Sequence, residues 1–127
     1  MTKARKALLA LLQECTEPVS ASMVSKAASL PFDQATIYRN LHYLEEQGYA
    51  DSFILHCSEH GTERYYSLRN QNGGTHHHWF HCEKCHRFID LGGCAYQEQM
   101  RAWEKQYGFT INDHTFFLTG ICASCKS

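Results

Sequence analysis

The sequence predicts an α+β protein of 127 residues in two parts, and three observations indicate it. Apolar residues recur at helical spacing through the first 47 residues, and two strand-like segments around a turn follow them. Beyond residue 71 lie six of the nine histidines and five of the seven cysteines. The segment 69–75 is polar and rich in glycine, so we expect domains at 1–70 and 71–127.

The first half is expected to form three short helices and a hairpin. Pro18 ends the first helix, Ser20 and Asp33 can cap the next two, and Gly48 ends the third. The expected elements are helices over residues 4–15, 20–29 and 33–47 and strands over 49–55 and 64–68, with a turn at Gly61. Helices followed by such a hairpin make a winged helix-turn-helix.

The second half is expected to form a small α/β unit with a mostly antiparallel sheet. The expected elements are strands over 76–82 and 87–91, a turn at Gly92 and Gly93, a helix over 95–107 and a final long strand over 109–119. Large apolar side chains recur along one stripe of that helix, at Tyr96, Met100, Trp103 and Tyr107.

Composition and charge exclude several classes of protein. No apolar run reaches the roughly 18 residues of a membrane span, and no cleavage site follows the basic N-terminus. We therefore expect a cytoplasmic chain with no membrane partner. The net charge is −1, which gives no general attraction to nucleic acid. An odd count of seven cysteines without a secretion signal argues against a disulfide framework, and together with nine histidines it points to metal.

Two Cys-x-x-Cys pairs predict a structural zinc site. Cys82 and Cys85 are separated from Cys122 and Cys125 by 36 residues. The two-residue spacing lets both thiolates of one turn bind the same tetrahedral ion. Each pair lies at the end of a predicted strand, so two strands can bring the pairs together. The alternatives are two redox motifs or four buried free thiols.

A histidine-rich strand leads into the first cysteine pair and predicts further metal ligands. Neighbouring side chains on a strand point to opposite faces. His76 and His78 therefore share one face, and His77 and His81 share the other. The candidate ligand sets on the two faces are His76, His78 and His114, and His77 and Asp90. The alternative is a surface-exposed or base-stacking histidine run.

The first hairpin carries three more metal-binding side chains, His56, Cys57 and His60. We interpret it as a wing loop that happens to contain them. A zinc deaminase is the enzymatic alternative, but it needs separate His-x-Glu and Pro-Cys-x-x-Cys motifs. Here His81-Cys82-Glu83 overlaps one cysteine pair, and no proline precedes either pair. We therefore expect no enzyme and no small organic substrate.

In combination, these motifs resemble the ferric uptake regulator (Fur) superfamily over nearly the whole chain. The members of that superfamily are dimeric metal-sensing repressors. The segments that carry the resemblance are Ala35-Thr36-Ile37-Tyr38-Arg39-Asn40-Leu41, His76-His77-His78, Cys82-Glu83-Lys84-Cys85, Ile89-Asp90, Gly108-Phe109-Thr110-Ile111-Asn112-Asp113-His114 and Cys122-Ala123-Ser124-Cys125.

The resemblance implies roles for individual residues. The four cysteines match a structural zinc site, and His77 with Asp90 matches part of a hinge sensing site. The second implied metal site, in the dimerisation domain, consists of His76, His78 and His114. The DNA-binding residues are expected to be Thr36, Tyr38 and Arg39 in a recognition helix, with Arg5 from the basic first helix.

Several positions depart from the family pattern. The usual sensing ligands are replaced by Pro18, Ser67, Trp79 and Gln97, so neither sensing site is complete in its usual form. An N-terminal helix that many members have is also expected to be missing. Asp51 lies where some zinc sensors of the family place a ligand. The candidate substitutes for the missing ligands are His81, Cys57 and Asp51.

We therefore expect a metal-dependent repressor of metal-homeostasis genes that binds a double-stranded DNA operator as a homodimer. Metal at the hinge would hold two DNA-reading heads at the half-site spacing of a palindrome. A structural zinc and a second, regulatory divalent metal are expected, and the donor set favours zinc over iron or manganese. The alternatives are an iron- or peroxide-responsive member, or a regulator with only the structural zinc.

Overall fold

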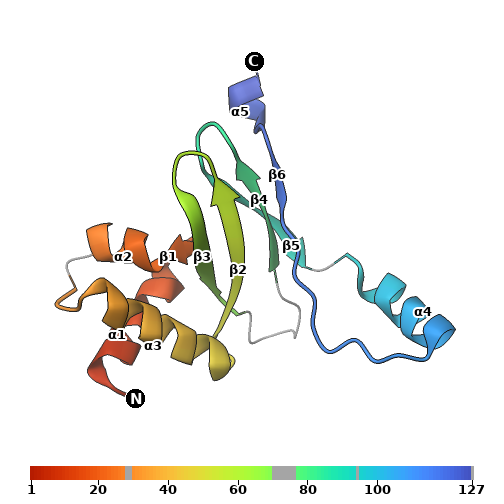
Figure 1. Ribbon diagram of the computed structural model, residues 1–127, viewed down its shortest axis with the longest axis horizontal. Helices are drawn as coiled ribbons and strands as arrows, with labels where there is room; N and C mark the ends of the chain where they lie inside the picture. Colours follow the sequence, from red (N-terminus) through yellow and green to blue (C-terminus); the bar gives the residue numbers. More distant parts are fainter. Residues whose placement is uncertain (28–29, 70–76, 94, 127) are drawn as a thin grey trace. The chain divides into compact units, whose positions relative to one another are not determined.

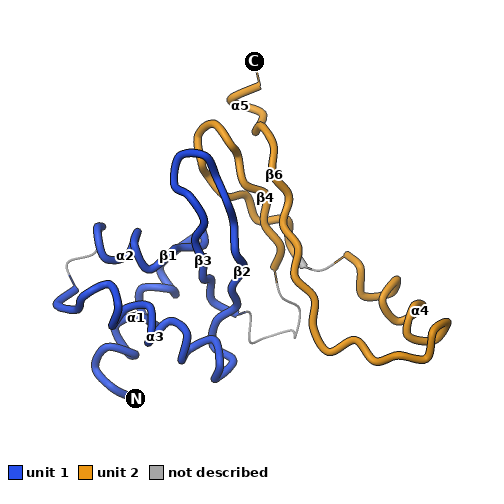
Figure 2. The backbone as a smooth tube through the Cα atoms, in the orientation of Figure 1, with its two compact units in different colours: residues 1–72 blue, residues 73–127 orange. Residues whose placement is uncertain are grey.

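The computed structural model describes residues 1–27, 30–69, 77–93 and 95–126. The chain divides into two compact units, Met1–Asn72 and Gly73–Ser127 (Figure 2). The domain boundary expected after residue 70 lies outside the described residues, and so does His76. Among the described residues, no helix is both long enough and apolar enough to cross a membrane.

The predicted α+β class is confirmed, with helices and mostly antiparallel strand pairs. Figure 1 shows the elements in chain order: α1 (Lys3–Glu14), β1 (Val19–Ser20), α2 (Ala21–Ala27), α3 (Gln34–Glu46), β2 (Ala50–Cys57), β3 (Gly61–Leu68), β4 (His77–Cys82), β5 (Phe88–Gly93), α4 (Gln97–Tyr107), β6 (Leu118–Gly120) and α5 (Ala123–Lys126).

Two predicted helix caps are confirmed in the first unit. The Ser20 hydroxyl accepts a hydrogen bond from the Met23 amide at 3.2 Å, and the Asp33 carboxylate accepts one from the Thr36 amide at 2.8 Å. Each side chain satisfies an N–H group that the first helical turn leaves without a backbone partner. The caps therefore define where α2 and α3 begin.

A single apolar core holds the three helices of the first unit against its sheet. The buried residues that form it are Leu8, Leu12, Ala21, Val24, Ile37, Leu41, Leu44, Ala50 and Tyr66. Complete burial of one leucine side chain stabilises a fold by roughly 1.5–3 kcal/mol. Because three of these residues come from α3, the core sets the orientation of that helix and leaves its opposite face exposed.

The sheet of the first unit has the order β1-β3-β2, with both pairs antiparallel. The β2–β3 hairpin runs from the Ala50–Leu68 pair to the Cys57–Gly61 pair and is longer than the sequence predicts. The two-residue strand β1 was not predicted, because so short a segment cannot show the alternation of apolar and polar residues that indicates a strand. Three helices and this hairpin complete a winged helix-turn-helix.

The second unit contains a sheet of order β5-β4-β6. β4 pairs antiparallel with β5 and parallel with β6. In the parallel pair Cys82 lies opposite Gly120, so both strands reach their cysteine pairs at the same edge of the sheet. The order of strands in this unit therefore brings the two cysteine pairs together.

The predicted long strand over 109–119 is wrong in its extent. Only β6 is a strand, and the chain takes an irregular path from α4 to it (Figure 1). Within the described residues, no strand pairs with residues 109–117, and a strand needs a partner for its backbone groups. The Ile111 amide instead donates to the Glu104 carboxylate at 2.8 Å.

The predicted turn at Gly92 and Gly93 is also wrong, because β5 continues through both residues. The pairing with β4 shifts register between His77 and Trp79, which indicates a bulge. Gly92 has a φ of +84°, a backbone conformation that glycine adopts without a steric penalty. A glycine pair can signal either a turn or a bulge, and the partner strand decides which one forms.

Candidate functional site

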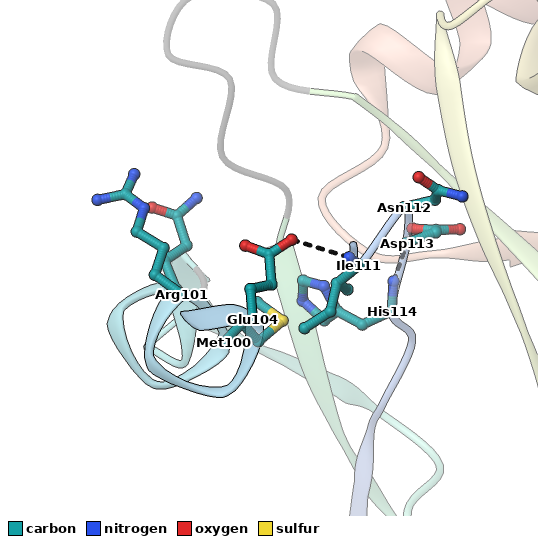
Figure 3. A pocket seen from close by; sticks show the side chains of 8 residues that line it. Met100, Arg101, Glu104, Ile111, Asn112, Asp113 and His114 are labelled. Atoms are coloured by element: carbon teal, nitrogen blue, oxygen red, sulfur yellow. Dashed lines mark hydrogen bonds between the residues drawn. The ribbon is translucent and has the colours of Figure 1, made fainter. Parts of the chain in front are cut away.

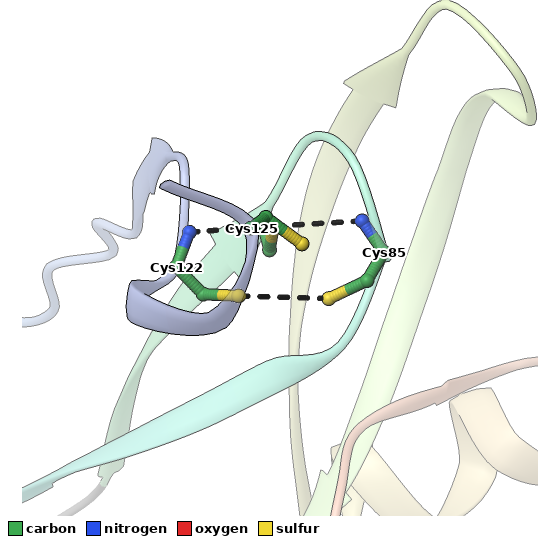
Figure 4. Close-up of side chains that lie close together, drawn as sticks. Cys85, Cys122 and Cys125 are labelled. Carbon is green, nitrogen blue, oxygen red and sulfur yellow. Dashed lines mark hydrogen bonds between the residues drawn. The ribbon is translucent and has the colours of Figure 1, made fainter. Parts of the chain in front are cut away.

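The four cysteines of the Cys-x-x-Cys pairs meet in the second unit. Their sulfur atoms all lie within 4.8 Å of one another, and Cys85 Sγ is 3.8 Å from Cys122 Sγ (Figure 4). A tetrahedral zinc site with Zn–S bonds of about 2.3 Å has sulfur–sulfur edges of about 3.8 Å. The quartet therefore fits zinc in both donor type and spacing.

Backbone N–H groups favour the thiolate form within the quartet. Cys82 Sγ accepts from the Cys85 amide at 3.5 Å and from the Cys122 amide at 3.4 Å. These bonds lower the pKa of Cys82 to about 5. The Cys125 amide lowers the pKa of Cys122, whereas the bond between the Cys125 and Cys122 side chains raises the pKa of Cys125 to about 12. Zinc binds the thiolate form of cysteine, and the lowered pKa values of Cys82 and Cys122 favour that form in two of the four ligands.

Arg87 lies beside the quartet and was not predicted from the sequence. A side-chain hydrogen bond to Cys122 is the main reason that the pKa of its guanidinium is raised. A neighbouring cation partly offsets the mutual repulsion of several thiolates. No motif identifies this residue, because only the folded turn brings it to the sulfur atoms.

His78 and His114 form a second cluster of nitrogen donors in the same unit. The two Nε2 atoms are 3.3 Å apart. His78 Nδ1 is 3.2 Å from the Phe116 carbonyl, which can only accept, so that nitrogen carries the proton. In the neutral ring this leaves the Nε2 lone pair for a metal. Two Zn–N bonds of about 2.05 Å would place the nitrogens about 3.3 Å apart.

A pocket of about 290 Å³ opens beside His114 (Figure 3). The residues that line it are Gln97, Met100, Arg101, Glu104, Ile111, Asn112, Asp113 and His114. Gln97 stands where the family resemblance implies an acidic ligand. Two carboxylates also line the pocket, that of Glu104 on α4 and that of Asp113 on the segment that follows it, and neither was predicted from the sequence. Glu104 lies two helical turns beyond Gln97, which is the signal that could have found it.

His77 and Asp90 lie on paired strands, as expected. His77 Nδ1 is 2.8 Å from Asp90 Oδ1, and the same oxygen accepts from the Gly92 amide at 2.7 Å. A carboxylate on one nitrogen of an imidazole orients the other nitrogen for a metal. The role of this pair in sensing stays a prediction.

The three candidate substitutes differ in their surroundings. His81 is buried, with its ring centroid 4.8 Å from that of Phe88 and 5.5 Å from that of His86. Cys57 is buried and in contact with its own hairpin turn. The Asp51 carboxylate already accepts two bonds from Arg69, at 2.9 and 2.6 Å. Metal binding by Asp51 would therefore have to displace an arginine.

The predicted DNA-binding residues of α3 lie on its outer side. Tyr38 and Arg39 are exposed, and Arg39 donates to the Thr36 hydroxyl at 3.2 Å. Arg5 is half-buried, with its guanidinium 3.5 Å above the Tyr43 ring and its Nε bonded to an Asn40 oxygen. Arg5 therefore packs α1 against α3, and its contact with DNA stays a prediction.

Comparisons with known proteins agree with this arrangement. The sequence pattern of the ferric uptake regulator family matches residues 1–119. The ferric uptake regulation protein of Campylobacter jejuni is 30% identical over 131 residues, covering 99% of this chain and 79% of that protein. The Helicobacter pylori ferric uptake regulator structure, described as having three functional metal-binding sites, matches with a TM-score of 0.71 at 18% identity, over 100% of this chain and 82% of that one.

A zinc uptake regulator complexed with zinc and DNA is also similar, with a TM-score of 0.67 at 22% identity, over 98% of this chain and 81% of that one. A winged helix-turn-helix followed by a unit with clustered metal donors is the plan of a metal-responsive transcription regulator, and not of an enzyme. The chain belongs to the ferric uptake regulator family.

Proposed function

We propose that this protein is a zinc-responsive repressor that binds operator DNA as a homodimer. The observation that carries the proposal is the 3.3 Å separation of His78 Nε2 and His114 Nε2, which matches two ligands of one metal ion. This pair is separate from the cysteine quartet. A site built on imidazole can exchange its ion more readily than four thiolates can, so it suits a sensing role.

The donor chemistry favours zinc as the metal that is sensed. Two imidazole nitrogens form the His78 site, and four cysteine sulfurs form the quartet. Both donor types suit zinc, whereas manganese prefers oxygen ligands. The similar proteins include ferric uptake regulators and a zinc uptake regulator, so iron is the competing metal. The carboxylates of Glu104 and Asp113 beside His114 are the feature that would favour iron.

DNA binding is assigned to the exposed side of α3. Thr36, Tyr38 and Arg39 lie within the first two turns after the Asp33 cap. In helix-turn-helix proteins the N-terminal residues of the second helix contact base edges in the major groove. The near-neutral net charge leaves little non-specific attraction, so we expect binding to depend on these few contacts.

Homodimer formation is assigned to the second unit. α4 has no buried residue, and large apolar side chains are exposed on it and just after it, at Trp103, Tyr107 and Phe109. Exposed apolar surface of this kind marks a site of protein association. A second copy of the chain would cover it and would give the two recognition helices that a palindromic operator needs.

The test combines metal content with DNA binding. The reduced protein is loaded with Zn²⁺, Fe²⁺ or Mn²⁺, its metal is counted, and its affinity for an operator selected from random DNA is measured for each metal. We expect more than one zinc per protomer and an affinity that rises most with Zn²⁺. A larger rise with Fe²⁺ would assign the protein to iron instead. One zinc per protomer with metal-independent binding would indicate a regulator with only a structural zinc.

A further inference from the structure

The tip of the β2–β3 hairpin contains a turn that resembles the first turn of the cysteine quartet. Cys57 ends β2, residues 58–60 form the turn, and Gly61 begins β3. The Cys57 side chain is buried at 8% exposure, while His60 is exposed. From the sequence alone, this Cys-x-x-His segment is expected to be a wing loop that happens to contain metal-binding residues.

The two turns share their hydrogen bonding. In the hairpin, the His60 amide donates to Cys57 Sγ at 3.1 Å. In the quartet, the Cys85 amide donates to Cys82 Sγ at 3.5 Å. Each bond joins the amide of the fourth turn residue to the sulfur of the first. The two turns therefore present a cysteine sulfur to the backbone in the same way.

The two turns also share the backbone conformation of the residue that follows them, which is Gly61 in the hairpin and His86 in the quartet. Gly61 has a φ of +73° and His86 has a φ of +63°. Among the described residues, His86 is the one with positive φ that is not glycine. In both turns this left-handed residue directs the chain into the next strand. The hairpin tip is therefore built like a turn that already belongs to a metal site.

The donor atoms of the hairpin have the spacing of two zinc ligands. Cys57 Sγ lies 3.3 Å from His60 Nδ1. One Zn–S bond of about 2.3 Å and one Zn–N bond of about 2.05 Å at a tetrahedral angle place the two donors about 3.6 Å apart. A shift of a few tenths of an ångström would accommodate the ion, and the exposed His60 side chain can make it without disturbing the core.

We propose that Cys57 and His60 form a zinc-binding turn at the tip of the wing, distinct from the cysteine quartet and from the His78 cluster. Cys57 Sγ binds as the thiolate, and its proton goes to solvent. His60 binds through Nδ1 and keeps its proton on Nε2. The turn supplies two ligands, as each Cys-x-x-Cys pair does in the quartet, and the remaining positions are filled by water or by other side chains.

The experiment counts zinc in the 127-residue chain with the quartet intact. Wild type, Cys57→Ser, His60→Ala and His56→Ala are reduced, dialysed to equilibrium against the same Zn²⁺ solution, and analysed for metal per protomer. His56 is the matched control, because it is an exposed histidine of the same hairpin whose Nδ1 is bonded to Thr62 at 2.8 Å. We expect both Cys57→Ser and His60→Ala to lose one ion and His56→Ala to lose none.

Cobalt provides a second readout that does not depend on the count alone. Co²⁺ bound by thiolate absorbs through sulfur-to-metal charge transfer, so Cys57→Ser should lower the Co²⁺ absorbance of the wild type by the contribution of one thiolate. Circular dichroism of each variant shows that it is folded. An unchanged zinc content in His60→Ala, or equal losses in His60→Ala and His56→Ala, would overturn the proposal. The proposed repressor function would be unaffected, since its test depends on His78 and His114.

Discussion

His78 and His114 are 36 residues apart in the chain, yet their Nε2 atoms lie 3.3 Å from each other. His78 is buried at 4% exposure on β4, and His114 lies in the irregular segment between α4 and β6. Two imidazole nitrogens at this separation can be ligands of the same metal ion. The pair is therefore the centre of the proposed sensing site.

Replacement of either histidine is expected to remove one metal ion. His78→Ala and His114→Ala should each retain the zinc of the quartet, lose one further zinc per protomer, and bind operator DNA with little response to added Zn²⁺. Elemental analysis and DNA-binding titrations measure both effects. His42→Ala serves as the control for metal content, since His42 is exposed on α3 and paired with Glu46 at 2.9 Å. Full zinc content in His114→Ala would contradict the assignment.

The quartet is expected to support the fold of the second unit. Cys85→Ser should lose the structural zinc, because the ion would retain only three thiolates. Structural zinc sites contribute apparent folding free energies of about 10–16 kcal/mol, so the variant should lose β-structure in the circular dichroism spectrum. Cys15→Ser is the control, since Cys15 lies at the end of α1, outside the quartet. Native spectra for both variants would show that the quartet is not structural.

Acid is expected to release the structural zinc. The pKa of Cys82 is lowered to about 5, so the stabilisation by its N–H donors is complete above the ordinary thiol pKa. That stabilisation is lost as the pH falls through about 5, where protons compete with the ion for sulfur. A coloured zinc chelator should report release of this ion around or below pH 5 in the double variant His78→Ala/Cys57→Ser, which lacks the other two proposed zinc sites. Release near neutral pH would contradict the prediction.

Arg39→Ala is expected to weaken operator binding without altering the fold. Arg39 is exposed on α3, and loss of one arginine contact to a base costs about 1–3 kcal/mol. Fluorescence anisotropy with labelled operator measures the change. Lys105→Ala removes the same charge from α4 in the other unit and should leave the affinity unchanged. Equal effects of both variants would indicate non-specific electrostatics instead of a recognition helix.

Leu41→Ala is expected to destabilise the first unit selectively. Leu41 is fully buried in the core that packs α3 against α1 and α2, and such a truncation costs about 2–5 kcal/mol. The thermal unfolding transition of the first unit should move to lower temperature while the quartet retains zinc. Ile54→Ala is the control, because Ile54 is 51% exposed on β2. A simultaneous loss of zinc would show that the two units unfold together.

Much of the local structure could be predicted because its causes are local. A capping side chain satisfies amides within three residues, as Ser20 and Asp33 do, and the apolar stripe of α3 follows the helical period. The Cys-x-x-Cys spacing likewise predicts two ligands in one turn. Strand alternation predicted that His77 and His78 point to opposite faces of their strand. His77 contacts Asp90 and His78 contacts His114, although His114 lies in an irregular segment and not on the predicted long strand.

The sequence by itself thus determined the winged helix-turn-helix and the two cysteine turns, and it predicted which further side chains could bind metal. Only the tertiary structure decided what depends on distant partners. It limited the last strand to Leu118–Gly120, paired that strand parallel to β4, and placed Arg5 on Tyr43. It also showed that the Cys57 turn resembles the Cys82 turn. A strand exists only where another strand forms hydrogen bonds with its backbone groups, and no local sequence pattern identifies which segment that will be.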